Sequence, residues 1–241
     1  MSTVSLLFVF ATIAGMASAL GGIACRWLGF DRPNANPYTL HAMTAFGGGL
    51  LLSAVAYGLT PAAMADLSPV TLAATFLSGG VAFYAVDRML AKRGGHRAQF
   101  LAMLLDALPE ALAMGALFST APAVGMLLAT FVGLQNLPEG FNAYRELRMG
   151  GLSSGKTQQL LLSMGILVPL VTWLGYAALN THPTLTAAVM SFCAGGLVYL
   201  LFQDIAPASA WKGHWSPPLG AVLGFSVGML CAQTLHIQGQ A

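Results

Sequence analysis

Charged residues are scarce in this sequence. Of its 241 residues, 7% are charged and 56% are hydrophobic. Ordinary soluble domains carry roughly 25% charged residues. The composition therefore excludes a typical soluble protein and indicates an integral membrane protein.

Cysteine pairs are also missing. The three cysteines, Cys25, Cys193 and Cys231, lie far apart in or beside apolar segments, and we expect buried, unpaired thiols. No His-Glu-x-x-His motif and no paired-cysteine motif occurs. We expect a protein that is not an enzyme and that carries no prosthetic group.

Long apolar stretches recur along the whole sequence. A helix needs ~20 apolar residues to cross the hydrocarbon of a bilayer, and eight stretches come near that length. The predicted membrane helices are 4–24, 40–61, 67–87, 99–119, 123–145, 158–179, 184–205 and 217–237. We predict an all-α polytopic membrane protein in which residues 1–241 form a single transmembrane domain.

Basic residues orient these helices. All ten Lys and Arg residues fall in or beside the first, third, fifth and seventh connections: Arg26, Arg32, Arg88, Lys92, Arg93, Arg97, Arg145, Arg148, Lys156 and Lys212. Short cytoplasmic loops carry the excess of Lys and Arg. We expect both termini to be extracytoplasmic, in a multi-pass protein of the cell membrane, specifically a bacterial inner membrane.

Two glycine-rich segments resemble each other. Residues Met43–Leu50 match Met190–Leu197, and Pro-Ala follows each, at Pro61 and Pro207. Their helices run in opposite directions through the membrane, as in the inverted repeats of transporters. Helices 1 to 3 and 6 to 8 would then flank a central hairpin of 99–119 and 123–145. Alternatively, these glycines only allow close helix packing.

The tripeptide Leu-Pro-Glu occurs in both predicted hairpin helices, ending at Glu110 and at Glu139. Asp106 and Gln135 precede these glutamates by four residues, so each pair shares a helix face. Counted from the cytoplasmic side at ~1.5 Å per residue, Asp106 lies level with Glu139 and Glu110 with Gln135. Four oxygen-bearing side chains can converge near the membrane midplane.

The proline of each motif has no N–H to bond the backbone carbonyl four residues earlier. The carbonyls left without this helical hydrogen bond are those of Leu105 and Leu134. A charged carboxylate in the bilayer costs at least ~2.5 kcal/mol, and no basic residue lies at this depth. The carboxyls must be protonated or bind a cation, and the all-oxygen set suits a hard divalent ion. The alternative is a network of protonated carboxyls hydrogen-bonded between helices.

These motifs resemble the ZIP family of divalent-metal transporters. Its fourth helix carries His-Asn-x-Pro-Glu-Gly and its fifth a Gln- or His-led x-x-Pro-Glu; the corresponding segments here are Asp106–Ala111 and Gln135–Gly140. The resemblance covers nearly the whole chain. It implies eight helices, extracytoplasmic termini and transport of a divalent metal into the cytoplasm through a midplane site.

The sequence departs from the family at several ligand positions. Asp106 replaces the usual histidine, Val168 stands where a glutamate often precedes the proline of helix six, and Gly58 and Ala62 flank the proline of helix two. We therefore expect a mononuclear site. Its metal ligands would be Asp106, Glu110, Gln135 and Glu139, with Asn136 as a weak helper. The resemblance implies an exit role for Asp204; alternatively, Asp204 is an ordinary interfacial acid at a helix end.

The expected cargo is Zn²⁺, Fe²⁺ or Mn²⁺, and the loss of histidine favours the harder ions. The expected partners are divalent metal ions and the lipid bilayer, with no nucleic acid, and a homodimer is compatible with the sequence. Two alternatives stay open: a proton-linked carrier of another solute, and a degenerate relative that does not transport.

Overall fold

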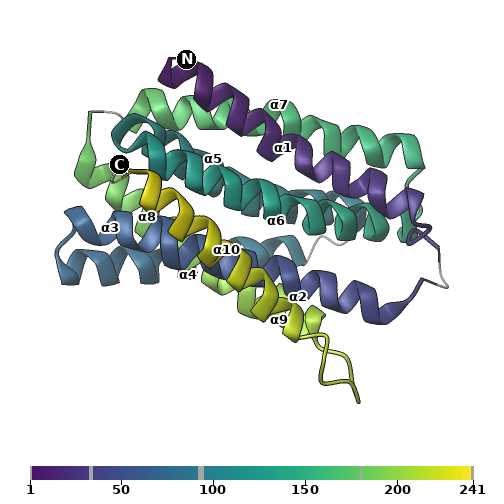
Figure 1. Ribbon diagram of the computed structural model, residues 1–241. Helices are drawn as coiled ribbons and strands as arrows, with labels where there is room; N and C mark the ends of the chain where they lie inside the picture. The colour runs from purple at the N-terminus through teal and green to yellow at the C-terminus, as the bar shows by residue number, and fades with distance from the viewer. Residues whose placement is uncertain (1, 33–34, 92–94, 180, 240–241) are drawn as a thin grey trace.

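The computed structural model describes residues 2–32, 35–91, 95–179 and 181–239, without the side chains of 91–102, 105–106 and 235–239. Each predicted membrane segment forms one continuous helical rod (Figure 1). The rods are α1 (Thr3–Trp27), α2–η1–α3 (Pro37–Ala54, Val55–Leu59, Thr60–Asp66), α4 (Pro69–Ala91), α5 (Gly95–Thr120), α6 (Pro122–Met149), α7 (Ser154–Leu179), α8–η2–α9 (Pro183–Leu200, Leu201–Ile205, Ala206–Ser209) and α10 (Leu219–Gly239). The described residues form no strand, so the all-α prediction is confirmed.

Proline and polar caps set several helix starts. Pro37, Pro122 and Pro183 occupy the first turns of α2, α6 and α8, where their missing N–H groups would have no intrahelical partner. The side chain of Asn36 accepts a hydrogen bond from the Tyr38 amide at 3.0 Å. These starts lie within a few residues of those predicted.

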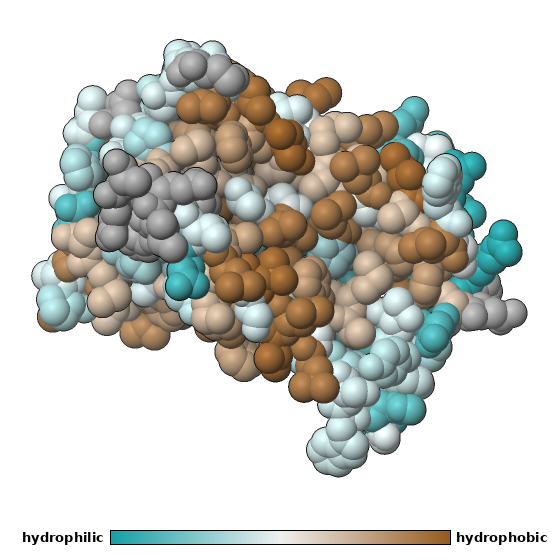
Figure 2. Space-filling model, viewed as in Figure 1, coloured by the Kyte–Doolittle hydropathy of each residue, from teal (hydrophilic) through white to brown (hydrophobic). Residues whose placement is uncertain are grey.

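In the described part of the chain, five rods are long and apolar enough to cross a membrane, namely α1, α2–η1–α3, α4 up to Leu90, α7 and α8–η2–α9. In α6 the polar side chains of Gln135, Asn136 and Glu139 lower the hydropathy. Apolar side chains gather over the middle of the molecule and polar ones toward its two ends (Figure 2). The protein is an all-α, multi-pass membrane protein, and its count of eight spans stays a prediction.

The rods pack in two groups (Figure 1). In the first group, α1 and α7 pack on each other, and both pack on the hairpin of α5 and α6. In the second, α2 packs on α10 and α4 packs on α8. The groups meet mainly where α2 contacts α6 and where α8 contacts α5.

The α2–η1–α3 and α8–η2–α9 rods have the same construction. Each has an α-helix of 18 residues, a π-helix of 5 residues and a short α-helix with proline in its first turn. Their starts, Pro37 and Pro183, lie 146 residues apart, as do the π-helix starts Val55 and Leu201. The glycine match of Met43 with Met190 had a spacing of 147.

Backbone contacts explain this one-residue difference in register. A β-carbon at Gly49 would meet the Ala221 carbonyl of α10, and one at Gly195 would meet the Phe76 carbonyl of α4. These two glycines are 146 residues apart and hold equivalent places in the two rods. The glycines that allow close helix approach therefore set the spacing of the repeat at 146 residues. The sequence match of Met43–Leu50 with Met190–Leu197 is shifted from it by one residue.

Candidate metal site in the α5–α6 hairpin

The two Leu-Pro-Glu motifs lie on neighbouring antiparallel helices. Ala121 is the single residue between α5 and α6, and the two helices pack together. Pro109 and Pro138 both lie inside these helices. The predicted hairpin is confirmed.

The flanking helices contact the hairpin in a matching way on both sides. On the α1 side, Gly21 packs on Leu137 and Gly140 on Ser18; on the α7 side, Gly175 packs on Leu112 and Gly115 on Thr172. Equivalent residues of α5 and α6 are thus 25 apart, since 115 corresponds to 140 and 112 to 137. Equivalent residues of α1 and α7 are 154 apart, from 18 to 172 and from 21 to 175.

This spacing changes the meaning of the repeated tripeptide. Adding 25 carries Glu110 to Gln135, whereas the two glutamates of the Leu-Pro-Glu motifs are 29 residues apart. The two motifs are therefore offset by about one helical turn and do not occupy equivalent places. The equivalent pair is Glu110 with Gln135.

This pair is deeply buried. The side chain of Glu110 is 1% exposed and that of Gln135 is 2% exposed, while Glu139 is half-buried. Among the described residues, neither amide atom of Gln135 has a hydrogen-bond partner. A buried polar group without a partner costs about 1–3 kcal/mol and is often explained by a bound ion or water.

The remaining predicted ligands differ in what is described of them. Asp106 lies on α5, but its side chain is outside the described part of the structure. Asn136 donates its Nδ2 to the Ala14 carbonyl of α1 at 2.8 Å, so its amide nitrogen ties α6 to α1. Its Oδ1 is the atom that would serve a metal.

Both prolines of the motifs lie in contact with the second helix group. The Sγ of Cys193 on α8 donates to the Pro109 carbonyl at 3.5 Å, and a β-carbon at Gly47 on α2 would lie 3.3 Å from Pro138 Cγ. Gly47 and Cys193 are 146 residues apart. Sequence reasoning treated Cys193 as an inert apolar residue, and the corrected repeat register would have singled it out.

Asp204 lies apart from the buried pair. It is exposed on η2, and no three His, Cys, Asp or Glu residues in the described part of the chain come together closely enough to hold a metal. His41 uses its Nδ1 on the Ala208 carbonyl at 2.8 Å, and His214 stacks on Trp211 with ring centroids 3.7 Å apart. The predicted exit role of Asp204 remains untested.

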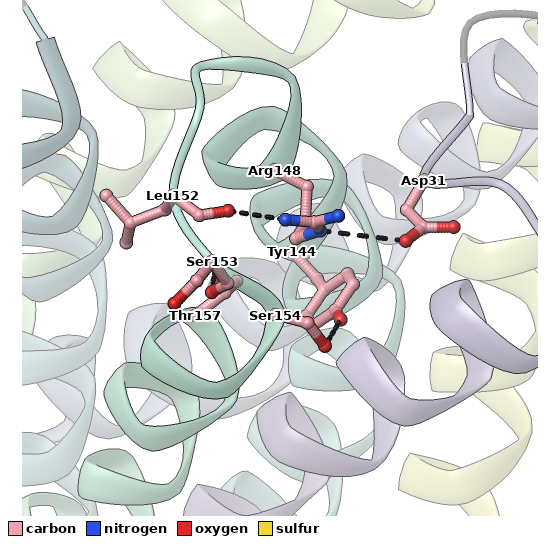
Figure 3. Close-up of polar contacts among 7 residues, drawn as sticks. All are labelled: Asp31, Tyr144, Arg148, Leu152, Ser153, Ser154 and Thr157. Atoms are coloured by element: carbon pink, nitrogen blue, oxygen red, sulfur yellow. Dashed lines mark hydrogen bonds and ion pairs between the residues drawn. The ribbon is translucent and has the colours of Figure 1, made fainter.

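The loop between α6 and α7 contains a motif that sequence reasoning passed over. Gly151–Gly155 has the spelling Gly-x-Ser-x-Gly, which in hydrolases places a nucleophilic serine between a strand and a helix. Here the motif joins two helices, and Ser153 caps α7 with its carbonyl accepting from the Thr157 amide at 3.0 Å. Ser154 shares a 2.7 Å hydrogen bond with Tyr144 (Figure 3). Both serines serve the loop, so the motif does not form a nucleophile site.

Arg148 completes the polar contacts of this loop (Figure 3). Its Nη1 donates to the Leu152 carbonyl at 2.6 Å, and its Nε lies 3.7 Å from Asp31 Oδ2. Asp31 follows α1, so these contacts join the ends of α1, α6 and α7. The first helix group is tied together at this end.

Comparison with known proteins shows a similarity to a transporter over part of the chain. No family model matches the chain. The chain is 31% identical over 138 residues to a zinc transporter, GufA, of Myxococcus xanthus, and the match covers 53% of this chain and 54% of that protein. The chain thus spans about half the length of this relative, which it resembles in sequence.

Proposed function

We propose that this protein is a ZIP-like transporter that moves a divalent metal ion, Zn²⁺, Fe²⁺ or Mn²⁺, into the cytoplasm. The observation that carries the proposal is the buried pair of Glu110 and Gln135 at equivalent positions of the hairpin. A carboxylate and a partnerless amide, both nearly inaccessible, suit an enclosed cation. The similarity to a protein named as a zinc transporter supports metal as the cargo.

The proposed site holds one metal between Asp106, Glu110, Gln135 and Glu139. These are oxygen ligands, which hard divalent cations prefer. Asn136 contributes its Oδ1 at most. On α7, Val168 is an apolar side chain that is 2% exposed, so it offers no carboxylate to a second metal.

The proposed architecture is an inverted repeat of eight spans with both termini outside. Support comes from the 146-residue spacing of the two π-helical rods and from the matched glycine contacts. In an inverted repeat, equivalent residues lie at mirrored depths. Glu110 and Gln135 are equivalent, and residue counting also places them at the same depth. Two residues at mirrored depths can share one depth only at the midplane.

Transport would proceed by alternating access, with one helix group moving against the other around this site. The first group of α1, α5, α6 and α7 carries the ligands and is joined by backbone contacts at glycines. The groups meet mainly along the α2–α6 and α5–α8 contacts. Asp204 would receive the ion on the cytoplasmic side.

Metal uptake into liposomes tests this proposal. Liposomes that contain the purified protein should take up Zn²⁺ or Mn²⁺. Liposomes that contain the Glu110→Ala, Glu139→Ala double variant should not. Asp66→Ala is the matched control, because Asp66 is an exposed acid at the end of α3. Metal uptake that survives the double substitution rules the site out.

The same preparations separate the two other functions. A proton-linked carrier of another solute would show pH-dependent flux that no divalent ion changes. A degenerate relative would neither bind metal in calorimetry nor transport it. The apolar Val168 is the observation that favours this second alternative.

A further inference from the structure

A hollow of about 390 Å³ lies between α3, α4 and α8, outside the hairpin. Its walls include Ala63 of α3, Leu72, Phe76 and Leu77 of α4, and Ala194 of α8. It belongs to the second helix group, and no proposed metal ligand lines it. The metal proposal makes no use of it.

The chemistry of the walls selects an apolar ligand. Among the described side chains, no charged residue lines the hollow, and its two hydroxyl groups belong to Thr60 and Ser191. The Ser191 hydroxyl already donates to the Leu72 carbonyl at 3.0 Å. Large cavities with apolar walls stay dry and accept apolar molecules, so neither an ion nor a polar solute fits here.

The hollow opens toward lipid. Only 11% of the apolar stretch of α4 is buried inside the protein, compared with 44% to 61% in the other four candidate spans. Leu77 is 67% exposed and Val70, beside the wall residue Pro69, is 80% exposed. In a membrane span, only hydrocarbon covers such side chains without cost. The mouth of the hollow therefore faces the bilayer interior.

We propose that this hollow is a binding site for one acyl chain of a bilayer phospholipid. A chain enters from the bilayer interior without crossing water, and it fills a recess that a flat helix face of a second copy would leave empty. The inference depends on the membrane placement of α4 and α8 and is independent of the metal site.

Occupancy of this site would reach the hairpin through α8. The wall residue Ala194 directly follows Cys193, whose thiol donates to the Pro109 carbonyl of α5. Close approach of α4 to α8 at Gly79 and Gly195 keeps the α8 backbone next to the hollow. A bound chain thus packs on the same helical turn that touches the first Leu-Pro-Glu motif.

The test uses two adjacent alanines of α4. Ala73 lines the hollow, whereas its exposed neighbour Ala74 does not, so Ala73→Trp fills the site and Ala74→Trp is the matched control. Each protein is placed in phosphatidylglycerol vesicles containing a lipid with a photoreactive diazirine in its acyl chain. Labelled peptides are then mapped by mass spectrometry. If Ala73→Trp is not monodisperse, Ala73→Leu replaces it.

We expect α4 and α8 peptides that line the hollow to be labelled several-fold more than other lipid-facing peptides. Ala73→Trp should abolish this excess and Ala74→Trp should keep it. Labelling that is uniform over exposed residues, or equal in both variants, would overturn the proposal. A loss of dimer mass in Ala73→Trp without a change in labelling would assign the hollow to a second copy instead.

Discussion

The two Leu-Pro-Glu motifs have the same sequence in different surroundings. The first ends in Glu110, which is 1% exposed and equivalent to Gln135 across the hairpin. The second ends in Glu139, which is half-buried and equivalent to the apolar Met114. The Pro109 carbonyl meets a thiol of α8, whereas Pro138 meets a glycine of α2.

The difference teaches that repeated letters and repeated structure need not coincide. Because the two motifs are offset by one helical turn, their glutamates lie at two different depths in the hairpin. Glu110 lies level with its equivalent residue Gln135. Glu139 lies one helical turn closer to the connection with α7. We therefore assign the larger role in holding the ion to Glu110.

The largest expected effect comes from separating the two glutamates. Glu110→Ala should weaken metal binding by more than Glu139→Ala does, because its carboxylate is the more enclosed. We expect a loss greater than the about 10- to 100-fold typical of removing an outer partner of a metal ligand. Calorimetric titration with Zn²⁺ and Mn²⁺ measures both. A larger loss for Glu139→Ala would reverse the comparison.

The glycine contacts around the hairpin come next. A β-carbon at Gly140 would meet the Ser18 backbone and one at Gly115 would meet the Thr172 backbone, so alanine at either position should destabilise the protein by about 1–3 kcal/mol or more. The two losses should be similar, because the positions are equivalent. Thermal unfolding in detergent measures them. Gly155→Ala is the control, since nothing lies within 4 Å of a β-carbon there; two clearly unequal losses would break the equivalence.

The neighbouring amide side chains of Gln135 and Asn136 should have different effects when removed, and these effects should be smaller. Asn136→Ala removes a buried 2.8 Å hydrogen bond to Ala14 and should lower the free energy of unfolding by about 1 kcal/mol. Because Asn136 is at most a weak helper, metal affinity should fall less than in Gln135→Ala. Gln135→Ala removes an amide that has no hydrogen-bond partner among the described residues, so it should weaken metal binding without destabilising the protein. Each variant is the other's control, assayed by thermal unfolding and calorimetry. Metal affinity that falls only in Asn136→Ala would exchange their roles.

Much of the fold follows from the sequence because apolar runs set the helix lengths. The helix predicted at 123–145 is observed at Pro122–Met149, and the helix predicted at 158–179 is observed at Ser154–Leu179. The π-helices at Val55–Leu59 and Leu201–Ile205 were not predicted. A π-helix accommodates one extra residue in a turn, and that choice depends on neighbouring helices.

The ligand set of the candidate site stays a prediction, and the structure bears only on how its residues are paired. Residue counting paired Glu110 with Gln135, and the glycine contacts agree with that pair. The contact of Cys193 with Pro109 was missed, because a thiol among apolar residues carries no signal of its own. Its signal is the equivalence with Gly47, which appears only once helix packing fixes the register at 146 residues.

The smallest expected effect tests whether that thiol takes part in the site. Cys193 is 2% exposed, and its Sγ to carbonyl contact of 3.5 Å is a weak hydrogen bond. Cys193→Ala should therefore cost less than about 1.5 kcal/mol of stability and leave metal affinity unchanged. Cys25→Ala is the matched control, because Cys25 is equally enclosed but belongs to the hydrophobic cluster of Phe141 and Tyr144, whereas Cys193 belongs to the other cluster. Weakened binding of Zn²⁺ in Cys193→Ala alone would mean that the first motif recruits a sulfur ligand from α8. The second motif, which faces Gly47, has no counterpart to such a ligand, so that outcome would deepen the difference between the two motifs.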